Sequence, residues 1–297
     1  MNTIGNNLVY CMAVEKLCDL DVPPRAQRVR VILTELQRIA SHLLWLGTSA
    51  LDLAAMSVFL YAMREREMIM DIFELVSGQR MMTTYIRPGG LWRDVPVEFE
   101  QTVRNFIKIL PKRIDEYESL LTNNPLFIER TIGIGKITAE ECIRWGVTGP
   151  VLRGSGMAFD LRKLHPYMGY EQYDFDVPTE TGGDINARYK VRVREMRESI
   201  KIVEQALDRL PLGPVLSNNR KYVPPPRAEI GTSMEALIHH FKLWTEGFTP
   251  PVGSVYAMAE SPRGELGCYL ESDGSPKPYR VHFKTPSFAN LQIMPLL

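Results

Sequence analysis

Asp52 is the side chain of this sequence with the clearest potential for proton chemistry. It is the only charged residue in the stretch 43–63. A buried carboxylate has a raised pKa unless it is paired or hydrogen-bonded, and either state suits a proton donor or an anchor for a histidine or arginine. The alternative is an ordinary aspartate at a helix end, because a loop can follow Gly47. Spacing alone does not choose between these two interpretations.

Two charged segments are further candidates. Glu260, Arg263 and Glu265 form a turn with three charges between two predicted strands, which indicates an exposed hairpin loop. The residues 64–67 read Arg-Glu-Arg-Glu, a pattern typical of a solvated helix face with local ion pairs. Because this segment ends an apolar helix, a role at an interface stays open.

The sequence contains no convincing metal or dinucleotide motif. Gly133 and Gly135 lack the third glycine of a dinucleotide loop and indicate a turn before a helix. His239 and His240 are adjacent, so on a helix they point about 100° apart and rarely share an ion, even with Cys268 available. The four cysteines form no C-x-x-C pair, so we predict no metal ligands in this chain.

Charge and hydropathy restrict the class of protein. The 35 basic and 35 acidic side chains cancel, which argues against a nucleic-acid binder and favours proteins or a neutral ligand as partners. No basic region followed by an apolar run marks a signal peptide. The stretch 43–63 is long enough to span a bilayer, but a central carboxylate costs about 3 kcal/mol there. We therefore predict a buried core helix and no transmembrane helix.

The helices that position Asp52 follow from the apolar periodicity of the first 78 residues. A helix over 7–17 is followed by Pro23 and Pro24, which favour a new helix start. In that second helix an apolar face runs through 32–44, and we expect Arg30, Glu35 and Arg38 to point elsewhere. Gly47 is predicted to break or bend it. The next helix, over 50–76, is expected to end at Gly78, a common position for glycine.

The remaining elements make the fold class mainly α with a small β element (α+β), a bundle of long helices. Residues 79–95 are predicted to form a loop, and Thr138 with Glu141 forms a capping box before a short helix. Further helices are predicted at 97–123, 184–210 and 233–243, and strands at 254–258, 267–271 and 279–283. We expect one domain over 1–297, with a core helical bundle over about 1–245 and a β-rich part over about 250–285.

Several segments, in this order and spacing, resemble one family over essentially the whole chain. They are VPPRAQ at 22–27, ASHLL at 40–44, LDL at 51–53, RERE at 64–67, YIRPGG at 85–90, LRGSG at 152–156, SMEALIHHFK at 233–242 and ESPRGELG at 260–267. The sequence is similar to the quinone-site subunits of respiratory NADH–quinone oxidoreductase (complex I), called the D subunit in bacteria and the 49 kDa subunit in mitochondria. Each segment alone is modest support, whereas the ordered set is specific.

The resemblance implies a fold related to the large subunit of nickel–iron hydrogenases, with the metal-binding cysteines lost. It implies quinone as substrate, no cofactor bound by this chain alone, and FMN and iron–sulfur clusters in partner subunits. The expected partners are the other complex I subunits, above all the terminal-cluster subunit and the quinone-channel membrane subunit, with no nucleic acid. The expected place is peripheral, on the cytoplasmic side of the bacterial cell membrane, where electron transport from NADH to quinone drives proton translocation.

The resemblance also implies roles for individual residues. Asp52 matches the aspartate that pairs with a quinone-binding histidine, and Thr48 matches a position in the same chamber. An imidazole held by a carboxylate can give a proton to a developing quinol oxygen. Residues Arg80, Met82, Tyr85 and Arg87 match the region near the terminal cluster. Many relatives carry a histidine where Met82 stands, and a thioether does not titrate, so we expect the cluster potential to depend little on pH.

Some parts of the family pattern fall outside this sequence. They are an N-terminal β region with the quinone-binding histidine, a quinone-binding tyrosine just before Met1, and the C-terminal end. Three alternatives follow: the large subunit of an energy-converting nickel–iron hydrogenase, a truncated remnant without catalysis, and a relative that takes electrons from ferredoxin. The quinone hypothesis, which we favour, expects Asp52 in a dry pocket close to residues 80–90.

Overall fold

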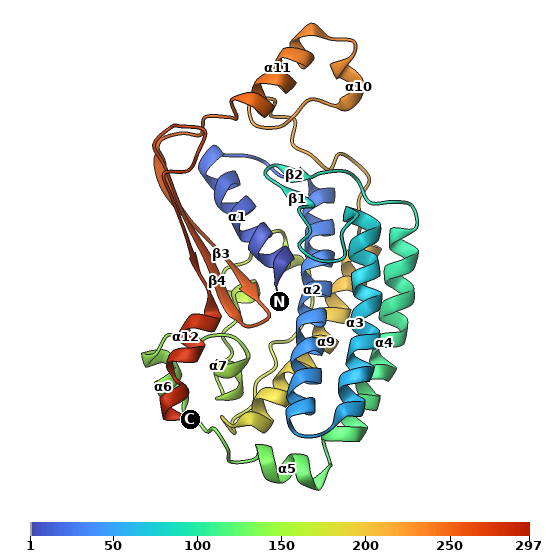
Figure 1. Cartoon of the computed structure of the whole chain (residues 1–297), viewed down its shortest axis with the longest axis vertical. Coiled ribbons are helices and arrows are strands. Elements are labelled where there is room, and N and C mark those ends of the chain that lie inside the picture. The colour runs from blue at the N-terminus through green and yellow to red at the C-terminus, as the bar shows by residue number, and fades with distance from the viewer. Residues whose placement is uncertain (1) are drawn as a thin grey trace.

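Four long helices form the body of the protein in the computed structural model, which describes residues 2–297. They are α2 (Pro24–Asp52), α3 (Met56–Ser77), α4 (Phe99–Leu121) and α9 (Ile185–Asp208). Figure 1 shows them packed along one another in one bundle, and α2 contacts both α3 and α9. The turn that joins α2 to α3 lies at one end of this bundle, and the loop that follows α3 lies at the other.

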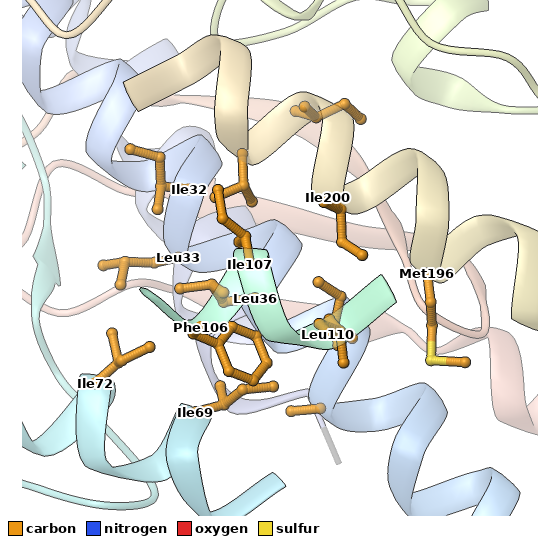
Figure 2. Packing of buried hydrophobic residues seen from close by; sticks show 14 of the residues in the cluster. Ile32, Leu33, Leu36, Ile69, Ile72, Phe106, Ile107, Leu110, Met196 and Ile200 are labelled. Carbon is orange, nitrogen blue, oxygen red and sulfur yellow. The ribbon is translucent and has the colours of Figure 1, made fainter. Parts of the chain in front are cut away.

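The bundle core is built from branched and aromatic side chains at helical spacing. Ile32 and Leu36 of α2 face Ile69 of α3, Phe106 of α4 and Ile200 of α9 (Figure 2). Each fully buried side chain of this size contributes about 1.5–3 kcal/mol through removal of apolar surface from water. This packing fixes the position of α2 along the bundle axis, and therefore the level within the bundle at which its polar side chains lie.

A second, smaller core joins the first helix to a sheet. The helix α1 (Thr3–Cys18) packs on β3 (Gly253–Ser261) and β4 (Gly264–Ser272), and β5 (Arg280–Lys284) completes an antiparallel sheet in the order β3-β4-β5. The register pairs Ala257 with Cys268. Alternate residues of the two long strands are buried against α1, as the period of two requires.

Shorter elements surround these two cores. They are β1 (Ile86–Arg87), β2 (Gly90–Leu91), α5 (Pro125–Thr131), α6 (Ala139–Arg144), α7 (Pro150–Gly154), α8 (Leu161–Leu164), η1 (Tyr170–Gln172), α10 (Arg227–Ile230), α11 (Met234–Thr245), α12 (Pro286–Gln292) and η2 (Met294–Leu296). The helix α11 stands away from the body in Figure 1 and leaves Phe241 and Trp244 largely exposed.

Most predicted elements are confirmed. The second helix begins at Pro24, α3 ends at Gly78 in the left-handed conformation (φ 76°), and the capping box of Thr138 and Glu141 opens α6. Ser233 caps α11. The three strands are found: β3 and β4 are longer than expected, and β5 has the expected length but begins one residue later. Gly133 and Gly135 lie in a turn with positive φ. The mainly α fold with a small β element is therefore correct.

The prediction that Gly47 breaks or bends the helix is wrong, since α2 continues to Asp52. A Cβ at Gly47 would lie 3.3 Å from the ring of Phe59 and 3.5 Å from the Cβ of Ala62. Gly47 therefore allows α3 to approach α2 closely.

The boundary between the two helices, predicted between Gly47 and residue 50, lies instead after Asp52. The chain turns at residues 53–55, where the amide of Ala55 donates to the carbonyl of Ala50 at 2.8 Å. Two antiparallel helices thus share the apolar stretch. Among residues 2–297, no helix is both long enough and apolar enough to cross a membrane.

Candidate functional site

Asp52 is the last residue of α2 and is exposed to solvent. The packing of α2 against α3 and α9 carries the helix end beyond the core, so the carboxylate stands at the tip of the α2–α3 hairpin. Apolar side chains beside it are exposed too, namely Leu51 (38%), Met56 (62%) and Leu60 (59%). The dry pocket expected around Asp52 is absent from residues 2–297 taken alone.

Thr48 lies one helical turn before Asp52 and is also exposed. Its hydroxyl donates to the carbonyls of Leu44 (2.9 Å) and Trp45 (3.1 Å) of its own helix. Two cavities of about 530 and about 1950 Å³ open elsewhere on the protein, and neither is lined by Thr48 or Asp52. Thr48 and Asp52 are thus open to solvent and line neither of these two cavities.

The segment expected near a terminal cluster lies at the opposite end of the bundle. Arg80 and Arg87 are exposed, and Met82 is 73% exposed with a positive φ of 58°. Tyr85 is buried and donates from its hydroxyl to the carbonyl of Arg93 at 2.8 Å. Burial raises the pKa of Tyr85, so this tyrosine is a neutral structural group.

The exposed arginine of that segment is held by acids of α3. Arg80 forms ion pairs with Glu67, Asp71 and Glu74. The 22 residues of α3 span about 33 Å at 1.5 Å per residue. Because α3 separates Asp52 from Arg80, the structure does not bring the two predicted groups together. The expectation that Asp52 lies close to residues 80–90 is wrong for this chain by itself.

A cluster of charged side chains lies inside the molecule and was not predicted from the sequence. We call it the buried charge cluster. Its members are Glu35, Arg38, His42, Arg153, Asp160, Arg162, Glu195 and Glu260. All eight residues are exposed by 2% or less. The cluster joins α2, α7, α8, α9 and β3, since Asp160 is the N-cap of α8.

Arg153 stands at the centre of one half of the cluster. Its Nε donates to Glu195 Oε1 at 2.7 Å, and its Nη1 donates to Glu260 Oε1 at 2.9 Å. The second oxygen of Glu195 shares a hydrogen bond with His42 Nε2 at 2.8 Å. A continuous chain of polar contacts therefore runs from His42 on α2 to Glu260 on β3.

Arg162 organises the other half. It donates to Asp160 Oδ2 at 2.6 Å and to Glu35 Oε1 at 3.1 Å. Glu35 also accepts hydrogen bonds from Tyr170 (2.6 Å) and Ser199 (2.7 Å). A carboxylate with this many donors is stabilised in its charged form, whatever the cost of burial.

The pKa values of the acids differ because their donors differ. Burial opposes ionisation at every one of them, yet the guanidinium of Arg162 lowers the pKa of Asp160 to about 2. Arg153 overcomes burial at Glu195 and lowers its pKa as well. At Glu260 burial prevails and raises the pKa. Burial also lowers the pKa of His42, although Glu195 opposes this shift.

Two predictions about charged segments are corrected by these contacts. Glu35 and Arg38 do not point away from the core, because α2 is enclosed on several sides, and Arg30 is buried with Glu15 at 2.6 Å. Glu260 does not lie in an exposed loop, since it belongs to strand β3 and is 1% exposed. The members of the buried charge cluster come from segments far apart in the sequence, so no local pattern identified them.

The rest of the turn between β3 and β4 is only partly exposed, since Ser261, Pro262 and Gly264 are buried. Arg263 is exposed and donates to Ser287 Oγ at 3.2 Å. Glu265 is half-buried and accepts from Lys284 at 2.9 Å and from Tyr256 at 3.1 Å. These contacts fix the position of the hairpin tip.

The segment 64–67 is not wholly a solvated helix face. Glu65 is buried and accepts a hydrogen bond from Tyr117 of α4, while Arg64 and Arg113 pair with it. The pair of α3 and α4 is thus joined by a buried acid. Arg66 and Glu67 remain on the outer side of the helix.

The histidines and cysteine considered as metal ligands have separate roles. His239 contacts the carbonyl of Val223 at 3.2 Å, His240 lies beside the ring of Trp244, and Cys268 belongs to the core between α1 and the sheet. Within the described part of the chain, no group of three or more histidine, cysteine or acidic side chains is placed to hold a metal ion.

Comparison with known proteins gives the family. The family model for the 49 kDa subunit of respiratory-chain NADH dehydrogenase matches residues 52–297. The chain is 63% identical to a D subunit of NADH-quinone oxidoreductase from Chloroflexus aurantiacus, over 97% of this chain and 71% of that relative. It is 64% identical to a D subunit of the same enzyme from Roseiflexus castenholzii, over 98% and 71% respectively. A match of this extent and identity shows that the chain belongs to the 49 kDa subunit family of NADH–quinone oxidoreductases.

Proposed function

We propose that this chain forms one wall of the quinone-reduction site of a proton-translocating NADH–quinone oxidoreductase. Membership of the family supports a role in such a complex, and the relatives bear the names of its subunits. Electrons from NADH would reach the quinone through FMN and iron–sulfur clusters of partner subunits. This chain would supply residues that line the quinone site and groups that take part in proton transfer. It would not catalyse the reaction alone.

The observation that carries this proposal is the setting of Asp52. A lone carboxylate at a helix end, flanked by exposed Leu51, Met56 and Leu60, is an unfavourable surface for an isolated protein. Another polypeptide segment that covers these apolar groups would leave Asp52 in a dry environment. There it would need a partner, and a histidine supplied by that segment satisfies the need.

The proposed mechanism follows from the chemistry of such a pair. A carboxylate orients an imidazole and stabilises its charged form, so that the ring can donate a proton to a developing quinol oxygen. Quinone takes up two electrons and two protons to become quinol. The role of Asp52 is to hold the histidine in position and to balance its charge, while Thr48 lines the same chamber.

We assign the segment 80–87 to the interface with the subunit that carries the terminal cluster, whose cluster must itself lie close to the quinone for electrons to reach it. The exposed side chains of Arg80, Met82 and Arg87 offer contacts to such a partner, and Tyr85 holds the loop from within. The quinone-channel membrane subunit would lie against the chain on another side. The complex would place this subunit on the cytoplasmic side of the cell membrane as a peripheral component.

The Asp52→Asn variant of the full-length protein tests the proposal. Asparagine keeps the size of the side chain but cannot stabilise an imidazolium, so quinone reductase activity should fall by at least about tenfold. Oxidation of NADH with an artificial acceptor should remain unchanged, because that reaction does not use the quinone site.

Asp208→Asn is the matched control for this test. Asp208 is also an exposed aspartate at the end of a bundle helix, where it pairs with Arg104. Its replacement should leave both activities close to the wild-type values. Equal quinone turnover in the Asp52 variant and the control would remove Asp52 from the mechanism.

A further inference from the structure

Charge balance singles out one acid of the buried charge cluster. The cluster contains three guanidinium groups, on Arg38, Arg153 and Arg162, and four carboxyl groups. With every acid ionised and His42 neutral, it would carry a net charge of −1 away from water. An uncompensated buried charge is strongly unfavourable, and a protein avoids it by keeping one group neutral. One proton on one of the four acids makes the cluster neutral.

The hydrogen bonds show which acid that is. Glu35 accepts from Tyr170 and Ser199 in addition to two arginines, and Asp160 is held by Arg162 through both oxygens. Glu260 accepts one short bond, from Arg153 Nη1 at 2.9 Å, and a long one from the amide of Leu161 at 3.3 Å. Among the four acids, Glu260 has the weakest set of donors.

A second carboxylate close to the guanidinium of Arg153 further disfavours ionisation of Glu260. Asp160 Oδ2 lies 3.8 Å from Arg153 Nη1, the atom that Glu260 Oε1 contacts at 2.9 Å. Two acids that share one cation do not both ionise readily when buried. Asp160 is also paired with Arg162 and stays ionised, so Glu260 is the acid that binds the proton.

Other groups around Glu260 do not reverse this conclusion. Arg38 of α2 donates to the backbone carbonyl of Glu260 and not to its carboxyl group, and the hydroxyl of Tyr167 accepts from the Glu260 backbone N–H at 3.0 Å. From α9, Glu195 faces Arg153 on its far side. Arg192, which stacks on Trp45, is half-buried and therefore partly screened by solvent.

We propose that Glu260 is a proton-carrying carboxyl group of this subunit, and that it exchanges its proton when the quinone site turns over. This proposal rests on the proposed function, since it gives that reaction a second group that binds a proton. Release of the proton to water changes the cluster from neutral to −1, and uptake of a proton from water restores neutrality. Arg153 stays protonated throughout, so it couples Glu260 to Glu195 and His42 by charge and does not itself pass a proton.

The position of the cluster allows this coupling. His42 precedes Asp52 by ten residues on α2, which is about 15 Å along the helix axis. A charge that appears near Asp52 during reduction is felt at that distance through a protein interior, where screening is weaker than in water. A buried group with an exchangeable proton can compensate for such a charge.

Redox-difference infrared spectroscopy of the assembled oxidoreductase tests the proposal. Reduction in the presence of quinone should produce a band of a protonated carboxyl group that shifts in D2O and on labelling with ¹³C-carboxyl glutamate. Glu260→Gln, which keeps the shape and can accept from Arg153, should abolish the band. The band should survive in Glu265→Gln, which replaces a half-buried glutamate of the same hairpin. The labelled wild-type complex makes the test possible even if the Glu260 variant does not assemble.

The pH profile of quinone turnover supplies the second readout. The Glu260→Gln variant should lose the alkaline decline that deprotonation of Glu260 causes, while NADH oxidation with an artificial acceptor stays unchanged. A wild-type complex without a glutamic acid band, a band that persists in Glu260→Gln, or superimposable pH profiles would each overturn the proposal. The Asp52→Asn variant separates the two failures: if it lowers quinone turnover while the glutamic acid band is missing from the wild-type complex, the proposal for Glu260 fails and the proposed quinone site stands.

Discussion

His42 makes the stability of the buried charge cluster sensitive to pH. Burial lowers the pKa of its imidazole from 6.5, while the hydrogen bond to Glu195 acts in the opposite direction. The unfolded chain therefore binds a proton at His42 more readily than the folded chain does. The stability that neutral His42 contributes is complete above pH 6.5, and it is lost as the pH falls through the folded-state pKa. The groups around the ring are Glu195, Arg192 and Arg38.

We predict that His42→Gln flattens this dependence, because glutamine keeps a donor for Glu195 but does not titrate. Hydrogen exchange of α2 peptides in the assembled complex, corrected for intrinsic rates, should show a smaller loss of protection in the variant below pH 6.5 than in the wild type. His165→Gln, which replaces an exposed histidine, serves as the control. The same acid sensitivity in wild type and His42→Gln would show that His42 is not the group responsible.

At the residue scale, neither the exposure of Asp52 nor the burial of Glu35 and Arg38 was predicted from the sequence. The resemblance directs attention to Asp52 and Arg80, both of which are exposed. Glu35 and Arg38 are expected on an outer face because isolated charges on an apolar helix normally face water. They are buried because Arg162 of α8 and Ser199 of α9 donate to Glu35, while Arg38 donates to a backbone carbonyl of β3. Such partners lie more than a hundred residues away in sequence, and periodicity within one helix carries no information about them.

At the element scale, the turn between β3 and β4 is pressed against the start of α7. Gly264 has φ +130°, and a Cβ there would lie 2.4 Å from Thr148 Oγ1 and 2.9 Å from the amide nitrogen of Gly149. Gly149 in turn has φ +75°, and its Cβ would lie 2.4 Å from the carbonyl oxygen of Arg263. This backbone contact sets the distance between Arg153 on α7 and Glu260 on β3.

We predict that Gly264→Ala destabilises the subunit by about 1–3 kcal/mol, through the left-handed backbone and the clash together. Gly146→Ala is the control, because Gly146 also has a positive φ of +66° but has no atom within 4 Å of the position that a Cβ would occupy. Thermal unfolding of the two variants in the assembled complex should show the larger decrease for Gly264→Ala. Equal decreases would mean that the contact with Thr148 and Gly149 does not constrain the hairpin.

Glycine within a helix shows where prediction of the elements fails. Helix periods, caps and strand positions are predictable, since they depend on local sequence. Gly47 is interpreted as a break because glycine weakens a helix. Its role becomes visible only with Phe59 and Ala62 of the neighbouring helix in place. The turn at 53–55, which separates α2 from α3, contains neither proline nor glycine and carries no comparable signal.

At the scale of the whole molecule, the two proposed contact regions lie at opposite ends of one bundle. Asp52 lies at the tip of the α2–α3 hairpin, and the segment 80–87 follows the other end of α3 (Figure 1). The residues of the buried charge cluster that belong to α2 lie between these two ends of the bundle. The helix α2 carries both Asp52 at its end and Glu35, Arg38 and His42 in the interior. A change of charge near Asp52 therefore acts on the buried charge cluster along this helix. The proposed function therefore requires that another polypeptide segment covers the Asp52 end in the complex.

An experimental structure of the assembled oxidoreductase with a quinone analogue bound tests this requirement most directly. We predict that the Asp52 carboxylate, exposed in this chain alone, is covered in the assembly and lies within hydrogen-bond distance of a histidine that contacts the quinone headgroup. An Asp52 that remains in open solvent, with the headgroup bound at a site that this hairpin does not line, would contradict the proposed function.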